Sequence, residues 1–583
     1  MQSKILEKLL KQIPVVNPLH KDIFCNACLN VINAKATVVA AENCYNSIPD
    51  EDKERKAFAK NSLDAAKKSL GTSMDLNVEV SILIVNSLDF DALCMLDILN
   101  LCILLDGTPE KLGTFANQST DQASLIDNLL KDPDLSRDIL LAGGAKGSQY
   151  GEAMQILRNI KNASSKIQGN DTLYRLALAT SLEHATPLAE FDTPRIFVDP
   201  IQRYLHYEDA FLTGELDLNF SSFTVWEYRM IVNCDAPDDQ IGWCRRMMRN
   251  YRPDEVLMDD YVWRYCLVVR TEVGYRKPQW TSIPRTYPQI VSGGGQCGPR
   301  AWFARFVCKS FGIPTWGARQ PGHAMAHHWT PNGWVGVLGA DWEYSFWEGR
   351  SGPDFLLETR ARVIEQDYFN NVQRLNMIAM TMGEKSLDSC SGLPDPDSFW
   401  FSLALMMKHY LSREKGQKTE KKSYVHENNL IIDCKSWSSM STTPTVKDNG
   451  VILIPAVSCS NPKSSTKSII FMKCFMGGMQ INCRDVDELE YTLPDIPKDR
   501  TYQLILRVCT VHLQQQPLLL TIHNKSDEGV TIASINVPYT IGEWQYTDPV
   551  EINLSQGMNV LCFQRQTPNF GLTIKDLTLI PEK

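Results

Sequence analysis

The first 255 residues carry apolar side chains at helical spacing. Over residues 54–70 and 150–167 apolar positions recur every three or four residues, which is the period of an amphipathic helix. Residues 239–250 repeat the pattern. We therefore expect a helical domain over residues 1–195 and a helical connecting region over residues 196–255.

The period changes to two in the last part of the chain. Tyr502, Leu504, Leu506 and Val508 alternate with Gln503, Ile505 and Arg507, and strict alternation predicts strands with one buried face. Short strands of this kind, separated by turn residues, are typical of a β-sandwich. We expect such a sandwich, with a jelly-roll arrangement, over residues 426–583.

The middle of the chain mixes both signals. Within residues 256–385 the pattern predicts a helix at 261–273, then a shorter helix and a hairpin, and a long helix at 354–380. Residues 386–425 are rich in Ser, Pro, Gly and charged residues, so we expect a linker. The predicted fold class is a multidomain α+β protein.

Length and composition narrow the choice of class. A chain of 583 residues is too long for one hydrophobic core, so three or four domains are expected. The net charge of -9 and the lack of a basic stripe argue against nucleic acid as a partner. The lysine-interrupted N-terminus does not resemble a signal peptide, and no membrane span is expected. The 17 cysteines then suit reduced thiols in the cytoplasm.

One cysteine stands in a setting that favours chemistry. Cys297 follows a run of three glycines that ends at Gly295 and precedes Pro299, after which apolar residues recur at helical spacing. Proline suits the first turn of a helix, so Cys297 is placed at the helix N-terminus. The helix dipole and free N–H groups there favour a thiolate. Taken alone, this segment fits a buried structural cysteine equally well.

A histidine and an acid follow on a predicted hairpin. If Trp329 pairs with Trp334 across the turn, His323 lies opposite Asp341 after a one-residue adjustment. His327 lies on the same face, four residues along. A thiol, an imidazole and an orienting carboxylate together support nucleophilic catalysis on an amide.

These segments resemble the transglutaminase-like core, a papain-like Cys–His–Asp superfamily. The resemblance covers about 120 residues and rests on the GQCG segment at a helix start, the GIP that ends the helix, the GHA segment, and the following GW and Asp. It implies that Cys297 is the nucleophile, His323 the general base and acid, and Asp341 the orienting group. Gln296 and Trp280 are the candidate oxyanion donors.

Several further residues are candidates for catalysis, substrate binding or metal binding, and a structural role is the alternative. His327 and Glu343 are the reserve catalytic residues. Three tryptophans are candidates for lining a substrate groove, and core packing explains each of them as well: Trp329, Trp334 and Trp342. Cys25 and Cys28 form a CxxC without a second pair at zinc spacing, so no metal site and no cofactor are expected.

The C-terminal strands resemble carbohydrate-binding modules of the galactose-binding-like group. That resemblance implies a carbohydrate as a possible partner of the sandwich. Trp544 and Tyr546 are the rings that would stack on a sugar, although their place in a strand pattern fits a core role for at least one of them.

Three functions follow from these patterns. The first is a thiol-dependent amide-bond enzyme that hydrolyses a peptide, protein or other amide, or transfers its acyl group to an amine. The second is a deglycosylating activity like that of peptide:N-glycanases, whose paired CxxC motifs are missing here. The third is a non-catalytic interaction scaffold with a relict core. The sequence leaves the substrate and the acyl acceptor open.

Overall fold

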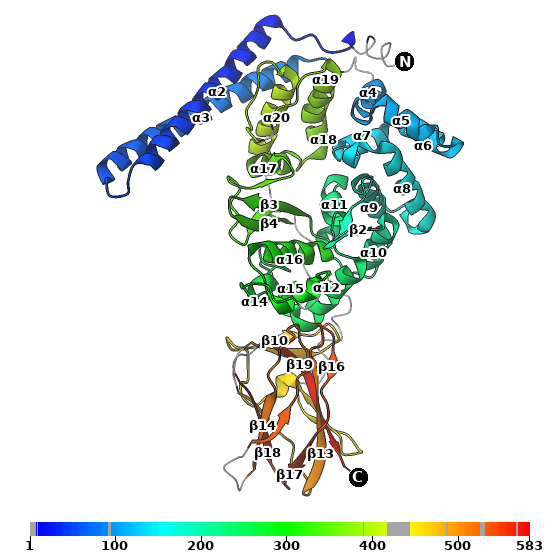
Figure 1. Cartoon of the computed structure of the whole chain (residues 1–583), viewed down its shortest axis with the longest axis vertical. Helices are drawn as coiled ribbons and strands as arrows, with labels where there is room; N and C mark the ends of the chain where they lie inside the picture. The colour runs from blue at the N-terminus through cyan, green and yellow to red at the C-terminus, as the bar shows by residue number, and fades with distance from the viewer. Residues whose placement is uncertain are drawn as a thin grey trace.

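The computed structural model has three regions arranged along its long axis (Figure 1). It describes residues 7, 10–90, 95–280, 283–388, 390–416, 443–484, 488–524, 531–566 and 570–582. Helices fill the N-terminal region, a helix-and-sheet region lies in the middle, and a β-sandwich forms the C-terminal region. The multidomain α+β class is therefore confirmed.

Two long helices form a hairpin that projects from the rest of the chain (Figure 1). They are α2 (Pro18–Ser47) and α3 (Lys53–Ser87), and the side chains of Asn17 and Asp52 cap their N-termini. By length and composition alone α2 is apolar enough to cross a membrane. In the structure its buried Phe24 packs edge-on against Phe399, with ring centroids 5.3 Å apart.

Among the remaining N-terminal helices, α9 packs against α8, α10 and α11, and its residues from Leu176 to Glu183 are all buried. This confirms the helical reading of the first 255 residues, including the helix predicted at 239–250. The helices are α4 (Met95–Gly107), α5 (Pro109–Ala116), α6 (Thr120–Lys131), α7 (Pro133–Leu141), α8 (Tyr150–Ala163), α9 (Asp171–Glu183), α10 (Pro200–Leu212), α11 (Val225–Val232), α12 (Asp238–Tyr251) and α13 (Pro253–Val256). A two-stranded sheet, β1 (Ala189–Glu190) and β2 (Thr193–Phe197), lies between α9 and α10.

The middle region packs helix α16 against a five-stranded antiparallel sheet. Helix α15 (Tyr287–Gly293) leads into α16 (Cys297–Ser310). The sheet order is β5-β4-β3-β6-β7. Its strands are β3 (Thr315–Gln320), β4 (His323–Thr330), β5 (Gly333–Val337), β6 (Phe346–Trp347) and β7 (Arg350–Ser351).

Two predicted helices of this region are wrong in extent. In place of a helix at 261–273 only α14 (Val268–Thr271) is helical, because Tyr265 has a φ of 66° and breaks the run. The long helix predicted at 354–380 is divided by a non-helical segment at residues 362–364. Its pieces are α17 (Gly352–Ala361), α18 (Glu365–Tyr368), the π-turn Phe369–Gln373 and α19 (Arg374–Met382).

The predicted linker at 386–425 contains a helix, α20 (Phe399–Gly416). Its apolar residues pack into the core formed by α2, α3, α4 and α19. The Lys408 ammonium lies 2.7 Å from the Glu358 carboxylate of α17, which also pairs with Arg362 and Arg350. Residues 417–425 lie outside the described residues.

The C-terminal region is a two-sheet β-sandwich, as predicted. One sheet has the strand order β10-β11-β19-β13-β16. In the same sheet β17 also pairs with β13, and β9 pairs with both β19 and β8. The other sheet has the order β12-β18-β14-β15. Residues 426–442 lie outside the described part. The strands are β8 (Thr445–Val446), β9 (Ile452–Pro455), β10 (Ile469–Lys473), β11 (Met479–Cys483), β12 (Leu489–Thr492), β13 (Arg500–Cys509), β14 (Leu518–Asn524), β15 (Thr531–Ile535), β16 (Gln545–Tyr546), β17 (Val550–Leu554), β18 (Asn559–Arg565) and β19 (Leu572–Pro581).

The sandwich docks through buried polar contacts on the end of α12 and on the segment that follows α14. His512 Nε2 lies 3.1 Å from the Glu272 carboxylate, and the Thr573 hydroxyl donates to the Tyr251 carbonyl at 2.9 Å. A Cβ added to Gly571 would lie 1.9 Å from the Tyr251 hydroxyl oxygen. The two regions therefore touch too closely here for any side chain at this position.

Candidate functional site

Three glycines bring the chain into position before Cys297. A Cβ on Gly293 would lie 2.3 Å from the Gln279 carbonyl oxygen, and one on Gly295 would lie 2.5 Å from the Pro299 ring. Gly294 has a φ of 72°, which other residues rarely adopt. The three glycines thus let the chain pass close to Gln279 and Pro299 just before α16 begins. Cys297 is the first residue of that helix.

Cys297 and His323 line one cavity of about 600 Å³. Cys297 comes from the N-terminus of α16 and His323 from the first position of β4. The cavity is completed by two aromatic rings, two arginines and the backbone that follows β5. These residues are Trp263, Arg270, Tyr275, Arg300, Ala324 and residues 336–340. The structure thus joins the first two of the three predicted catalytic residues.

A backbone carbonyl, not Asp341, is bonded to His323. The Nε2 atom of His323 lies 2.8 Å from the Leu338 oxygen. A carbonyl only accepts, so Nε2 donates this bond, and in the neutral form of the ring Nδ1 is the nitrogen with the free lone pair. The Asp341 carboxylate instead accepts from the Glu343 backbone N–H at 2.9 Å, and Asp341 is exposed.

The departure of Asp341 has a local cause. Trp329 pairs with Trp334 and His327 with Gly336, as the turn predicts, but the ladder ends at Val337. Leu338 and Gly339 then adopt φ values of 60° and 79°, which turn the chain away from β4. The expected pairing of His323 with Asp341 is therefore not formed.

The reserve base His327 belongs to an aromatic cluster. Its ring lies 3.9 Å from that of Trp342 and 5.6 Å from that of Trp316, and it is 0% exposed. Burial lowers its pKa to about 3, and neither ring nitrogen has a hydrogen-bond partner among the described residues. His327 is thus a neutral core side chain.

A second cysteine–histidine pair lies beneath the surface. The Cys266 sulfur is 3.9 Å from His328 Nε2, and both residues are buried. Hydrogen bonding to the Cys308 thiol and to His328 holds the pKa of Cys266 below its usual range, despite burial. His328 also bonds to the Val262 and Trp329 carbonyls, each at 3.0 Å. The pair holds the segment after residue 260 against β4.

The two oxyanion candidates occupy different places. Gln296 is exposed at the N-cap of α16, and its side chain caps none of the first-turn N–H groups. Trp280 packs against Gly293, under the Arg285 guanidinium at 4.8 Å. Trp280 is not among the residues that line the cavity with Cys297. The first N–H groups of a helix have no intrahelical partner, so the Cys297 and Gly298 N–H groups are the remaining candidate donors.

The groove candidates pack elsewhere. Trp334 and Trp342 join an aromatic cluster around Phe355, with the Trp342 and Phe355 rings stacked 6.2 Å apart. Trp329 meets Phe223 edge-on at 4.9 Å. Glu343, the reserve acid, is exposed on the turn after Asp341. In the described chain these four side chains are absent from the wall of the Cys297 cavity.

Sequence reasoning missed four side chains of the cavity. Arg300 had a usable signal, because a residue three positions after Cys297 lies on the same face of a helix. Trp263, Arg270 and Tyr275 come from a segment that is mostly not helical and that packs across the sheet. The spacing of apolar residues in that segment predicts a helix and does not predict that its side chains reach the cavity.

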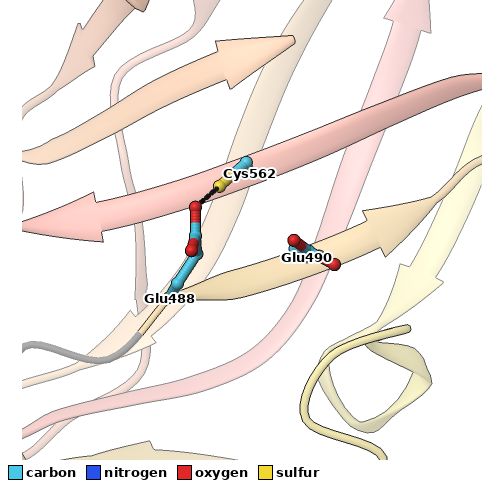
Figure 2. Close-up of side chains that lie close together, drawn as sticks. All are labelled: Glu488, Glu490 and Cys562. Carbon is cyan, nitrogen blue, oxygen red and sulfur yellow. Dashed lines mark hydrogen bonds between the residues drawn. The ribbon is translucent and has the colours of Figure 1, made fainter. Parts of the chain in front are cut away.

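The group Glu488, Glu490 and Cys562 could offer three metal ligands within 4.8 Å of one another (Figure 2). Figure 2 shows the Cys562 thiol pointing at the Glu488 carboxylate, to which it donates a hydrogen bond. Burial, and then this bond, raise the pKa of Cys562 to about 12. Metals bind the thiolate, so the group as it stands is a hydrogen-bonded thiol and carboxylate.

The two sugar-stacking candidates differ in exposure. Trp544 packs against the core of the middle region, whereas Tyr546 on β16 is 60% exposed. The Arg507 guanidinium lies 5.6 Å from the Tyr546 ring and pairs with Asp576. Only Tyr546 of these two therefore presents its ring to solvent.

A scan against models of known protein families found no match, and a search of curated proteins found none. Solved structures similar to the C-terminal sandwich include the C-terminal family 6 carbohydrate-binding module of a marine laminarinase from Zobellia galactanivorans (14% identity, 22% of this chain, 98% of that chain, TM-score 0.18). Others are a family 6 module from Clostridium stercorarium in complex with cellobiose (16%, 22%, 92%, 0.18) and a β-1,3-glucan-binding family 6 module from Bacillus halodurans (14%, 22%, 95%, 0.18). The likeness concerns the β-sandwich and carries no conclusion about its ligand.

Proposed function

We propose that this protein is a cysteine-dependent amide-bond enzyme with Cys297 as nucleophile and His323 as general base and acid. The observation that carries the proposal is the shared cavity of about 600 Å³, into which α16 presents Cys297 and β4 presents His323. Cys297 is partly exposed, whereas most of the described cysteines are buried. Its accessibility distinguishes it from a structural thiol.

The chemistry follows from the two side chains. His323 Nδ1 takes the thiol proton, and the sulfur attacks the amide carbonyl carbon, forming a tetrahedral oxyanion. The N–H groups at the start of α16 stabilise that oxyanion. The C–N bond then breaks, the amine leaves with the proton from the imidazolium, and a thioester remains on Cys297. Water or a second amine attacks the thioester and restores the thiol.

The Leu338 carbonyl takes the part that an orienting carboxylate has in a triad. It fixes the tautomer of His323 through the 2.8 Å contact to Nε2, and a hydrogen bond of this kind sets which nitrogen is basic. A neutral carbonyl stabilises an imidazolium less than a carboxylate does. The proposed enzyme therefore relies more on the helix N-terminus than a Cys–His–Asp enzyme does.

The test is to trap the thioester. The protein is incubated with glutamine peptides, other peptide amides and glycopeptides, quenched in acid, and digested for mass spectrometry. The proposal expects an acyl adduct on the Cys297 peptide, lost in Cys297→Ala and His323→Ala but kept in Cys390→Ala, which removes an exposed thiol outside the cavity. Amide cleavage that survives in Cys297→Ala contradicts it.

Carbohydrate binding by the sandwich is a second candidate, favoured by the exposed Tyr546 ring beside the Arg507–Asp576 pair. The Arg507 guanidinium lies over one face of the ring, and the exposed remainder of the ring is the surface that would contact a sugar. Binding to immobilised glycans should fall in Tyr546→Ala and persist in Tyr344→Ala, which removes an exposed tyrosine outside the sandwich. Equal binding by both variants contradicts this role.

A further inference from the structure

The wall of the Cys297 cavity carries two positive charges and no carboxylate. Arg270 and Arg300 line it together with Trp263 and Tyr275, and the other lining residues are apolar or backbone apart from His323 and Cys297. Among the described residues neither arginine has an ion-pair partner within 4.0 Å, although the structure pairs many of its other arginines. The charge of this wall is therefore unbalanced.

Both guanidinium groups are held against aromatic rings. Arg270 lies 4.7 Å from the centroid of the Trp263 ring and Arg300 5.7 Å from that of Tyr275. One Arg300 nitrogen also donates to the Val273 carbonyl. Stacking and this bond restrict the side chains, so less freedom is lost when a ligand binds.

The arrangement suits a planar anion. A guanidinium offers two parallel N–H donors that match a carboxylate. The cavity is open, since Arg270 and Tyr275 are exposed, and its two cations attract a substrate carboxylate and repel a substrate ammonium group. Arg300 follows Cys297 by one helical turn, so the anion would lie close to the reacting carbonyl.

We infer that the amide substrate of this site carries a carboxylate next to the carbonyl that Cys297 attacks, and that Arg270 and Arg300 bind it. This inference rests on the proposed function. An acidic side chain beside the reacting amide and the free carboxylate of a chain end share this chemistry. Basic and neutral amides are then poor substrates.

Two alkylating reagents test the charge directly. Iodoacetate and iodoacetamide both form a carbon–sulfur bond and release iodide, but only iodoacetate is anionic. The rate with iodoacetate divided by the rate with iodoacetamide is measured at Cys297 and at the exposed Cys390 by peptide mass spectrometry. We expect the ratio at Cys297 to exceed that at Cys390 by at least about fivefold at low salt, and to fall as salt screens the arginines.

Variants assign that preference to residues. Arg270→Gln and Arg300→Gln should each lower the Cys297 ratio several-fold, and the double variant should bring it to the Cys390 value. Arg195→Gln, an exposed arginine outside the cavity, should leave it unchanged. An equal ratio at the two cysteines, or an unchanged ratio in the double variant, overturns the inference.

A binding measurement separates this inference from the proposed function. In Cys297→Ala, saturation-transfer NMR compares the amidated peptide acetyl-Asp-Gln with acetyl-Lys-Gln, and acetyl-Gln with a free carboxylate distinguishes a chain end. Binding of an acidic ligand that is lost in the double arginine variant supports the anion site even if Cys297 proves unreactive. Equal binding of the Asp and Lys peptides overturns it even if Cys297 is the nucleophile.

Discussion

His323 is bonded through Nε2 to the main-chain oxygen of Leu338, at 2.8 Å. Its ring orientation therefore depends on a backbone turn that a side-chain substitution does not remove. The turn itself is unusual, since Leu338 and the following Gly339 both have positive φ. Such a residue at the mouth of a cavity is a common sign of a constrained functional segment.

The first prediction concerns Asp341, the acid that the sequence pairs with His323. Asp341→Ala should lower the rate of Cys297 acylation by less than about tenfold, because its carboxylate bonds to its own turn and not to His323. In Ser–His–Asp enzymes the corresponding loss is about 10⁴. His323→Ala should cost far more. A loss of several thousandfold in Asp341→Ala would show that the side chains rearrange to form the triad.

His327 should make the protein sensitive to acid. Burial lowers its folded-state pKa to about 3, from an ordinary value of 6.5. Between these values the unfolded chain binds a proton that the folded chain excludes, so stability falls as the pH drops through the window. The loss approaches about 1.4 kcal/mol for each pH unit. His327→Phe should make the fall of the urea midpoint between pH 6.5 and 4 less steep, while burial of His184, His206 and His409, which also lowers their pKa values, keeps part of it.

The neighbouring histidine supplies the control for that experiment. Unlike the change at His327, His328→Phe should already destabilise the protein at pH 7, because it removes hydrogen bonds to the Val262 and Trp329 carbonyls. An unchanged pH dependence in His327→Phe would contradict the prediction, since it would mean that the folded protein does not exclude a proton from His327.

Gly571 should be essential for docking of the sandwich. In Gly571→Ala the new Cβ would meet the Tyr251 hydroxyl at 1.9 Å, so either that contact or the interface must open. We expect faster proteolysis between the two regions and a larger radius by X-ray scattering. Gly113→Ala is the matched control, since nothing lies within 4 Å of its added Cβ. Identical scattering from both variants would contradict the tight contact.

Glu358 should be the most costly single charge to remove from the helical region. Its pKa is held well below the usual range, despite burial, by Lys408, Arg362 and Arg350. Glu358→Gln removes the carboxylate that pairs with Lys408 and Arg362, while Arg350 keeps Asp354, and we expect the change to cost about 3 kcal/mol. Glu365→Gln, on an exposed site, should change stability by less than about 0.5 kcal/mol. Thermal unfolding distinguishes the two; equal melting temperatures would contradict the ion cluster.

Elements with a clear local period could be predicted from the sequence. Strand β13 keeps Tyr502, Leu504, Leu506 and Val508 on the buried face, because alternation alone assigns the two faces of a strand. The register of the β4–β5 hairpin was equally accessible, since the Pro331–Gly333 turn leaves few ways to pair Trp329 with Trp334.

Elements that depend on distant contacts could not be predicted. The helix expected at 261–273 is interrupted at Tyr265, where the chain bends and Cys266 reaches His328. Helix α20 lay in a predicted linker, and the core that holds it includes residues of α2 and α3, more than 300 residues away in the sequence, as well as of the nearby α19. The same holds for the site. Cys297 and His323 could be predicted from sequence motifs, whereas Leu338 and Arg270 reach the cavity because of backbone turns that no motif predicts.

The central claim is that Cys297 is an activated nucleophile assisted by His323. The most direct measurement is the rate of alkylation by iodoacetamide at each cysteine between pH 5 and 9, read by mass spectrometry on the native protein. We predict that at pH 6 to 7 Cys297 reacts faster than the exposed Cys44 and Cys390, and that His323→Ala removes this advantage. Labelling of Cys297 no faster than of Cys44 and Cys390, with or without His323, would contradict the claim.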